Sequence, residues 1–169
     1  QDATTFLRGD NTFATPAGGT NTPAFEAYLS ANQSVTNLTT TKIQFNTEIF
    51  DTNSAYDNST NYRFTVPAGE NGKYYIYTSI RSQTVTNFKL YLPQVWIYKN
   101  GSVYKQASFY NNNSYQPLFQ TLTASATLDL SDGDYIEIYG NVESTDSSNG
   151  IIGGGSAKIS AFGAYKILT

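Results

Sequence analysis

Cysteine, histidine and methionine are absent from this chain of 169 residues. The lack of cysteine excludes disulfide bonds and thiolate metal sites. The lack of histidine excludes imidazole acid–base chemistry, the usual catalytic triads and most zinc sites. Paired carboxylates remain a route to glycoside hydrolysis, but the scattered glutamates form no recognisable catalytic motif. We therefore expect a protein that is not an enzyme.

Charged residues are also scarce, at 14% of the chain with a net charge of −3. Binding to nucleic acid needs a basic patch or stripe, so we expect no nucleic-acid partner. No apolar run is long enough for a transmembrane helix. Asparagine, threonine and serine are abundant instead, and aromatic residues reach 15%. This composition is typical of a β-rich surface in an extracellular or virion protein.

The first 22 residues have little apolar content and several turn residues, which predicts an extended arm at 1–22 before a domain at 23–169. Because no initiator methionine precedes Gln1, we expect a processed product or an excised part of a longer protein. The arm contains the tripeptide Arg8-Gly9-Asp10, which integrins recognise elsewhere, although a simple turn explains it equally.

Short alternating segments separated by turn residues recur about every ten residues, and no window has a helical period. Asn100-Gly101 between two such segments predicts a tight hairpin. Residues 51–61 and 143–155 are polar and are expected to form loops. The main expected strands cover residues 24–29, 42–45, 62–66, 74–81, 95–98, 103–109, 118–130, 135–139 and 158–168. The pattern predicts an all-β sandwich or jelly roll.

The segment after the Pro67–Gly72 turn carries bulky side chains on both faces of its expected strand. Tyr74 and Ile76 alternate with Tyr75 and Tyr77. One face should pack on the core of the domain. We expect the other face to be covered by a second copy of the same chain.

Several motifs, in order over residues 23–168, resemble the globular head domain of the first complement component, subcomponent q, which is related to the tumour necrosis factor jelly rolls. These motifs are Ala24-Phe25, Lys42-Ile-Gln-Phe-Asn46, Tyr62-Arg-Phe-Thr-Val-Pro67, Gly72-Lys-Tyr-Tyr75, Tyr98-Lys-Asn-Gly101, Leu128-Asp-Leu-Ser-Asp-Gly-Asp134 and Phe162-Gly-Ala-Tyr-Lys-Ile-Leu168. The resemblance implies a jelly-roll β-sandwich of about ten antiparallel strands in two sheets, assembled as a trimer.

The same resemblance implies that Tyr75, Tyr77 and Tyr165 face the three-fold axis of a homotrimer. Their neighbours on the opposite face would then fill the core of the monomer: Tyr74, Ile76, Phe162 and Ala164. The alternative is that Tyr75 and Tyr77 lie on a sheet face open to solvent.

The Asn/Thr/Tyr-rich composition is similar to members of this family in bacteriophage and other viral structural proteins. We expect a virion structural protein, either a capsid decoration or the tip of a fibre, whose arm at 1–22 attaches to a neighbouring virion or shaft protein. Two alternatives are a secreted protein- or glycan-binding module of the same fold and a glycan-processing enzyme. The expected location is the virion surface or the extracellular space.

Two loops carry candidate binding groups. Tyr110, Asn112 and Tyr115 combine aromatic rings with amides, which suits the hydroxyl groups of a host-surface glycan and suits a solvated loop tip equally. Asp132 and Asp134 are candidate calcium ligands, with turn formation as the alternative role. Calcium is the one cofactor considered, and no other is expected.

Overall fold

The computed structural model describes residues 5–7, 9–10, 12–14, 21–112 and 114–167. Within these ranges every regular element is a β-strand and no helix occurs. In chain order the strands are β1 (Phe6–Leu7), β2 (Phe13–Ala14), β3 (Ala24–Tyr28), β4 (Gln33–Val35), β5 (Thr41–Lys42), β6 (Thr47–Asp51), β7 (Tyr56–Asp57), β8 (Arg63–Thr65), β9 (Gly72–Thr84), β10 (Leu90–Lys99), β11 (Ser102–Ser108), β12 (Phe119–Leu130), β13 (Tyr135–Ser144), β14 (Gly150–Ile152) and β15 (Ala161–Lys166). The expected all-β class is confirmed.

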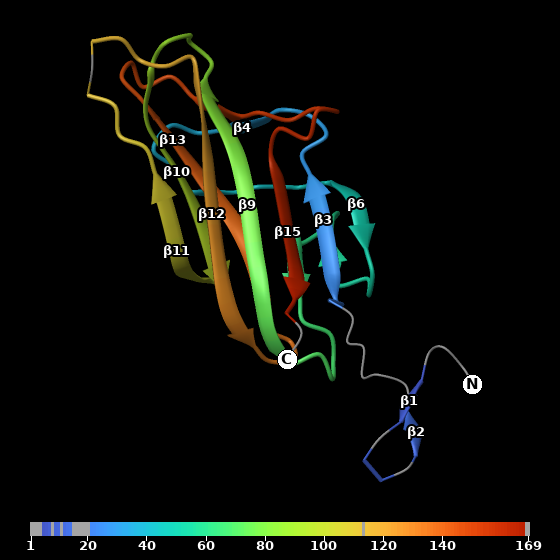
Figure 1. Ribbon diagram of the computed structural model, residues 1–169. Helices are drawn as coiled ribbons and strands as arrows, with labels where there is room; N and C mark the ends of the chain where they lie inside the picture. The colour runs from blue at the N-terminus through green and yellow to red at the C-terminus, as the bar shows by residue number, and fades with distance from the viewer. Residues whose placement is uncertain (1–4, 8, 11, 15–20, 113, 168–169) are drawn as a thin grey trace.

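Two antiparallel sheets form a β-sandwich (Figure 1). The seven-stranded sheet has the order β4-β14-β9-β15-β3-β6 and lies in front in Figure 1. β14 and β15 pair with different parts of β9, and β12 pairs with β9 along nearly its whole length. The six-stranded sheet behind it has the order β11-β10-β13-β8-β7, with β5 also on β13. Neighbours within a sheet often come from distant parts of the chain, as in a jelly roll.

The core lies between the two sheets and is rich in aromatic rings. Phe25 stacks on Tyr56 with ring centroids 4.6 Å apart and meets the edge of Phe162 at 4.9 Å. The four side chains expected to fill the core are buried, which confirms that prediction: Tyr74, Ile76, Phe162 and Ala164. The family resemblance, combined with the period of two along β9 and β15, therefore gives the inner face correctly.

Two segments predicted to be loops contain strands, and these predictions were wrong. Residues 143–155 include the end of β13 and all of β14, which pairs with both β4 and β9. Residues 51–61 include β7, which pairs with β8. Pairing with another strand overrides the polar local composition in both places. The strand expected at 42–45 is shorter, because only Lys42 belongs to β5.

The hairpin joining β10 to β11 is confirmed at the predicted position. Asn100 and Gly101 both have positive φ angles, of 51° and 75°. A two-residue hairpin loop needs this backbone shape, and asparagine and glycine adopt it readily.

The two ends of the sandwich differ in what they carry (Figure 1). The start of β3, the end of β15 and the β1–β2 hairpin lie at the lower end in Figure 1. The loops from β9 to β10, β11 to β12 and β13 to β14 lie at the opposite end, which we call the tip. Arg8 of the Arg8-Gly9-Asp10 tripeptide lies outside the described residues, while Asp10 accepts a hydrogen bond from the Thr12 amide at 3.0 Å.

Candidate functional site

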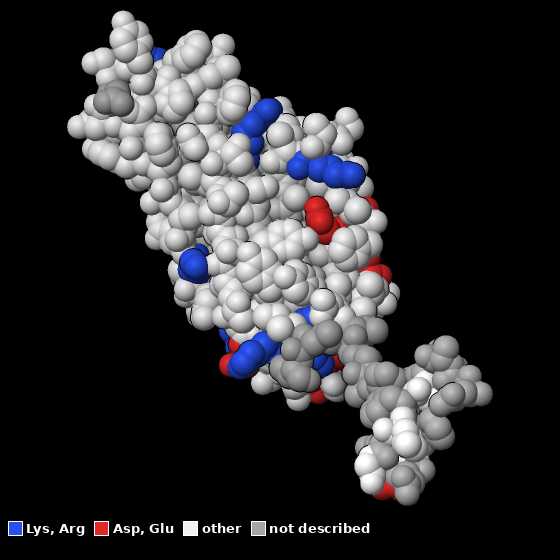
Figure 2. Space-filling view, viewed as in Figure 1, with Lys and Arg blue, Asp and Glu red and all other residues white. Residues whose placement is uncertain are grey.

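The outer face of the seven-stranded sheet carries few charged groups, and two of them, Glu26 and Lys158, lie beside its tyrosines. Figure 2 shows this face, with few coloured groups between its two ends. The outward positions of β12 alternate along the strand and hold polar side chains such as Thr121, Thr123 and Ser125. Those of β9 and β15 hold Tyr75, Tyr77 and Tyr165, and we call this surface the tyrosine face.

The three tyrosines expected at an assembly axis lie together on the tyrosine face. The ring centroid of Tyr75 is 6.1 Å from that of Tyr77 and 5.5 Å from that of Tyr165. Tyr165 is 36% exposed, and the other two are partly covered. The structure thus brings the predicted residues into one cluster, and their role in contact between copies stays a prediction.

Tyr77 is held in one orientation by two neighbours. Its hydroxyl donates a hydrogen bond to Oε2 of Glu26 at 3.0 Å. Burial, and then the negative charge of Glu26, raise the pKa of the Tyr77 hydroxyl above its ordinary value, so it stays a neutral donor. A Cβ atom on Gly163 would lie 2.4 Å from the Tyr77 ring, so only glycine leaves room for this ring on β15.

A hollow of about 480 Å³ opens beside these rings on the tyrosine face. It is lined by side chains that include Glu26, Tyr77, Thr123, Ser125 and Lys158. The tyrosine face is therefore hollowed rather than flat.

The predicted ligand loop lies at the tip. Tyr110 is held by Tyr91, whose hydroxyl donates a hydrogen bond to the Tyr110 hydroxyl at 2.9 Å. Tyr110 and Tyr115 are exposed, as is Asn112. The three predicted residues thus occupy one exposed loop, and ligand binding there stays a prediction.

The predicted calcium residues form turns at the lower end of the sandwich. Asp134 accepts hydrogen bonds from the Ser131 amide at 2.9 Å and the Asn100 side chain at 2.7 Å, and Lys99 lies 2.9 Å from its Oδ2. These contacts, led by the Ser131 amide, lower the pKa of Asp134 to about 2. Asp132 accepts a hydrogen bond from the Gly69 amide at 2.9 Å.

Among the residues that the structure describes, no three acidic side chains are placed to hold a metal ion together. Asp132 and Asp134 connect the turn before β13 to the turns before β9 and β11. Calcium binding at this place stays a prediction.

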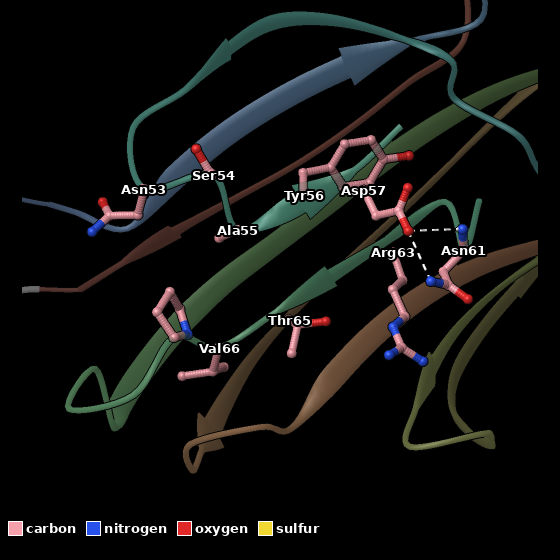
Figure 3. Close-up of a pocket in the computed structure, with 10 residues that line it drawn as sticks. Asn53, Ser54, Ala55, Tyr56, Asp57, Asn61, Arg63, Thr65 and Val66 are labelled. Atoms are coloured by element: carbon pink, nitrogen blue, oxygen red, sulfur yellow. Dashed lines mark hydrogen bonds between the residues drawn. The ribbon is translucent and has the colours of Figure 1, made fainter. Parts of the chain in front are cut away.

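A second hollow, of about 330 Å³, lies beside β7 and β8 (Figure 3). Its acidic group, Asp57, accepts hydrogen bonds from the amides of Thr60 at 2.8 Å and Asn61 at 3.0 Å. These amides lower the pKa of the Asp57 carboxyl well below its usual range. The guanidinium of Arg63 lies 4.4 Å from the centroid of the Tyr135 ring. Asp57 therefore holds the turn that follows β7, and Arg63 packs on Tyr135, so both charged groups of this hollow have contacts within the chain.

Sequence reasoning missed the partners that position the tyrosine face. Gly163 leaves room for the Tyr77 ring, and Glu26 accepts the hydrogen bond of its hydroxyl. The register of β9, β15 and β3 places the three residues beside one another. No local signal in the sequence shows this register.

Across the described ranges, no helix is long and apolar enough to cross a membrane.

Comparison with known proteins adds one curated relative. Over 106 residues the chain is 33% identical to the phage-like element PBSX protein XkdV of Bacillus subtilis strain 168. The matched stretch makes up 58% of this chain and 14% of that relative, so the chain spans only a small part of its length.

Solved structures with a similar fold share little sequence with the chain. The globular domain of the zebrafish complement 1qA protein has a TM-score of 0.60 at 17% identity, with 86% of this chain and 98% of that chain covered. The Eiger TNF structure from S. frugiperda has a TM-score of 0.58 at 12% identity, with 86% and 92% covered. Murine APRIL has a TM-score of 0.58 at 10% identity, with 85% and 98% covered. The jelly-roll fold is thereby confirmed.

A family model described as the C1q domain matches residues 24–167. This match covers the whole sandwich, from β3 through β15. The chain therefore belongs to the C1q domain family.

Proposed function

We propose that this protein is a non-enzymatic structural and binding head of a virion, built from three copies of the chain. The observation that carries this proposal is the tyrosine face. Three neighbouring tyrosines lie on a sheet face with few charged groups, and no other strand of the described chain covers this face in Figure 1. Surfaces of this kind mark sites of protein contact, and aromatic residues are enriched at the centre of interfaces.

Association of identical chains usually gives closed cyclic symmetry. Tyr75, Tyr77 and Tyr165 of each copy would face the common axis, and their partly polar rings would pack against their counterparts. The hollow beside Tyr77 would receive side chains from the adjacent copy. Three copies is the number that the family resemblance implies.

The arrangement of the two ends supports a head that displays one end outward. The β1–β2 hairpin lies at the lower end in Figure 1, so the arm at 1–22 would attach there to a shaft, capsid or neighbouring protein. The loops of the tip would then face away from the particle. The relative from a phage-like element supports a virion setting over other settings of this fold.

A secreted binding module is the second candidate, because the zebrafish complement domain has the same fold. Imaging of native particles from the source by electron cryomicroscopy separates the two. The proposal predicts three-fold knobs on the particle surface, joined to it through residues 1–22. Particles without such knobs, together with free protein in the medium, would favour the secreted module.

A further inference from the structure

Exposed apolar and aromatic side chains gather on two loops at the tip, away from the tyrosine face. The loop from β9 to β10 carries Val85 and Phe88, and the loop from β11 to β12 carries Tyr110, Tyr115 and Leu118. Tyr115 is 92% exposed and Phe88 is 59% exposed. The contact between Tyr91, which follows the first loop, and Tyr110 of the second loop joins the two loops. Exposed apolar side chains that gather in this way mark contact surfaces.

Contacts with the start of β10 and hydrogen bonds within the loop hold the second loop, and they give the Tyr110 ring a defined place. The Tyr91 and Tyr110 rings meet edge to face with centroids 5.1 Å apart, and their hydroxyls are 2.9 Å apart. The Asn111 amide donates to the Tyr91 carbonyl at 3.1 Å, and the Asn111 side chain donates to the Tyr115 carbonyl at 3.2 Å. Rings fixed in this way lose little conformational entropy when a ligand binds.

Phe88 points to function by its backbone. Its φ angle is 59°, in the left-handed region that bulky residues avoid. Its ring is largely exposed, so packing within the chain does not account for a phenylalanine at this position. Glycine would adopt the same backbone without strain. The backbone strain and the exposed ring together make Phe88 a candidate contact residue at the tip.

The chemistry of the tip favours a neutral ligand rich in hydroxyl groups. Residues 106–128, which include the loop from β11 to β12, contain no charged side chain. The other two loops of the tip carry Lys89 and Asp146, whose opposite charges attract each other. Asn112 adds an exposed amide beside the rings. Aromatic rings offer flat apolar faces, and amide and phenol groups both donate and accept hydrogen bonds. Pyranose rings present one apolar face edged by hydroxyls, which matches this combination.

We propose that the tip binds a neutral polysaccharide chain, with Phe88, Tyr110 and Tyr115 stacking on sugar rings and Asn112 hydrogen bonding to their hydroxyls. This inference deepens the proposed function by naming the ligand class of the head, and it rests on that function only for the outward orientation of the tip. The site itself is contained within one copy of the chain.

The test is a glycan array probed with the full chain, carrying neutral hexose and N-acetylhexosamine chains beside sialylated and phosphate-bearing chains. We expect binding to neutral chains that persists in about 1 M salt, where the screening length is about 3 Å. Phe88→Gly and Tyr110→Ser should each weaken this binding by about tenfold, the value of one good aromatic contact. Tyr104→Ser, which removes an exposed tyrosine from β11, is the matched control and should leave binding unchanged.

Phe88→Gly is informative because it removes the ring and relieves the backbone strain together. We expect its melting temperature to equal or exceed that of the native chain, so lost binding would not reflect unfolding. The inference is overturned if no neutral chain binds, if only charged chains bind, or if both tip variants bind like the native chain. The mass of the protein in the same samples tests the proposed assembly independently of sugar binding. A monomer that binds sugar would refute the assembly and leave the ligand proposal intact.

Discussion

Gly163 and Tyr77 fit each other across two strands that are far apart in sequence. The ring occupies the space that any larger residue at position 163 would fill, and the hydroxyl reaches Glu26. Neighbouring residues Phe162 and Ala164 point into the core instead. The contact therefore shapes the tyrosine face without taking part in the core.

Gly163→Ala should displace the Tyr77 ring and break its hydrogen bond to Glu26. We expect a cost of about 1–3 kcal/mol, as for other overpacked contacts, seen mainly as weaker association of the copies. Sedimentation at a series of concentrations measures the association. The double variant Gly163→Ala/Tyr77→Ala supplies the control, because the added methyl group should have little further effect once the ring is gone. If Gly163→Ala weakened association equally in the native chain and in the Tyr77→Ala variant, the proposed contact between position 163 and the Tyr77 ring would be refuted.

Asp134 gives the protein a defined response to acid. Its pKa is lowered to about 2, first by the Ser131 amide and then by Asn100 and Lys99. The ordinary pKa of an unfolded aspartate is about 3.9. Because the folded value is the lower one, its stabilisation is complete above about pH 4 and is lost as the pH falls toward 2.

Asp134→Asn should lower the free energy of unfolding by about 1–2 kcal/mol at neutral pH, since a charged acceptor is replaced by a neutral one. The difference from the native chain should shrink as the pH falls below about 4. Urea unfolding at several pH values measures both quantities. A difference that stays constant down to the lowest pH would contradict the assigned role.

At the scale of elements, β9 shows most directly how the sequence determines the two faces of a strand. Tyr74 and Ile76 are fully buried, while Tyr75 and Tyr77 lie on the outer face. The period of two separates these two sets of side chains, and the family resemblance assigned Tyr74 and Ile76 to the core. Tyr74 and Tyr75 are therefore adjacent tyrosines with different expected roles, the first in the core and the second in contact between copies.

Tyr75→Glu should separate the copies and leave the jelly roll folded, because an unpaired charge in an interface costs about 3 kcal/mol or more. Tyr74→Ala, one residue away, should lower the free energy of unfolding by about 3–5 kcal/mol, as for other buried aromatic residues. Circular dichroism and denaturant unfolding distinguish the two effects. Unfolding by Tyr75→Glu with little effect of Tyr74→Ala would show that the two faces are reversed.

Strands with strong alternation could be predicted from sequence, and short strands could not. The expected strand at 118–130 corresponds to β12, and the Asn100-Gly101 turn is where it was predicted. β7 and β14 were missed because each has only two or three residues, in polar or glycine-rich surroundings. Their pairing with distant strands creates them, and such pairing leaves no local pattern.

The candidate site could be predicted only in part, for the same reason. Alternation placed Tyr75 and Tyr77 on one face, and the family resemblance added Tyr165 from the closing strand. Gly163 and Phe88 could not be identified, because the first depends on strand register and the second on a backbone angle. Both depend on the folded chain as a whole.

At the scale of the whole molecule, the sandwich separates three regions. The arm hairpin lies at one end, the exposed aromatic tip at the other, and the tyrosine face along the side between them (Figure 1). A head that assembles through its side can keep its tip free for a ligand. This arrangement depends on one central claim, that copies of the chain cover each other's tyrosine faces.

The mass of the native chain in solution tests this claim most directly. Light scattering or native mass spectrometry at micromolar concentration should give three times the chain mass of 18.6 kDa. Tyr75→Glu should give the single-chain mass under the same conditions. A stable monomer of the native chain at micromolar concentration would contradict the account.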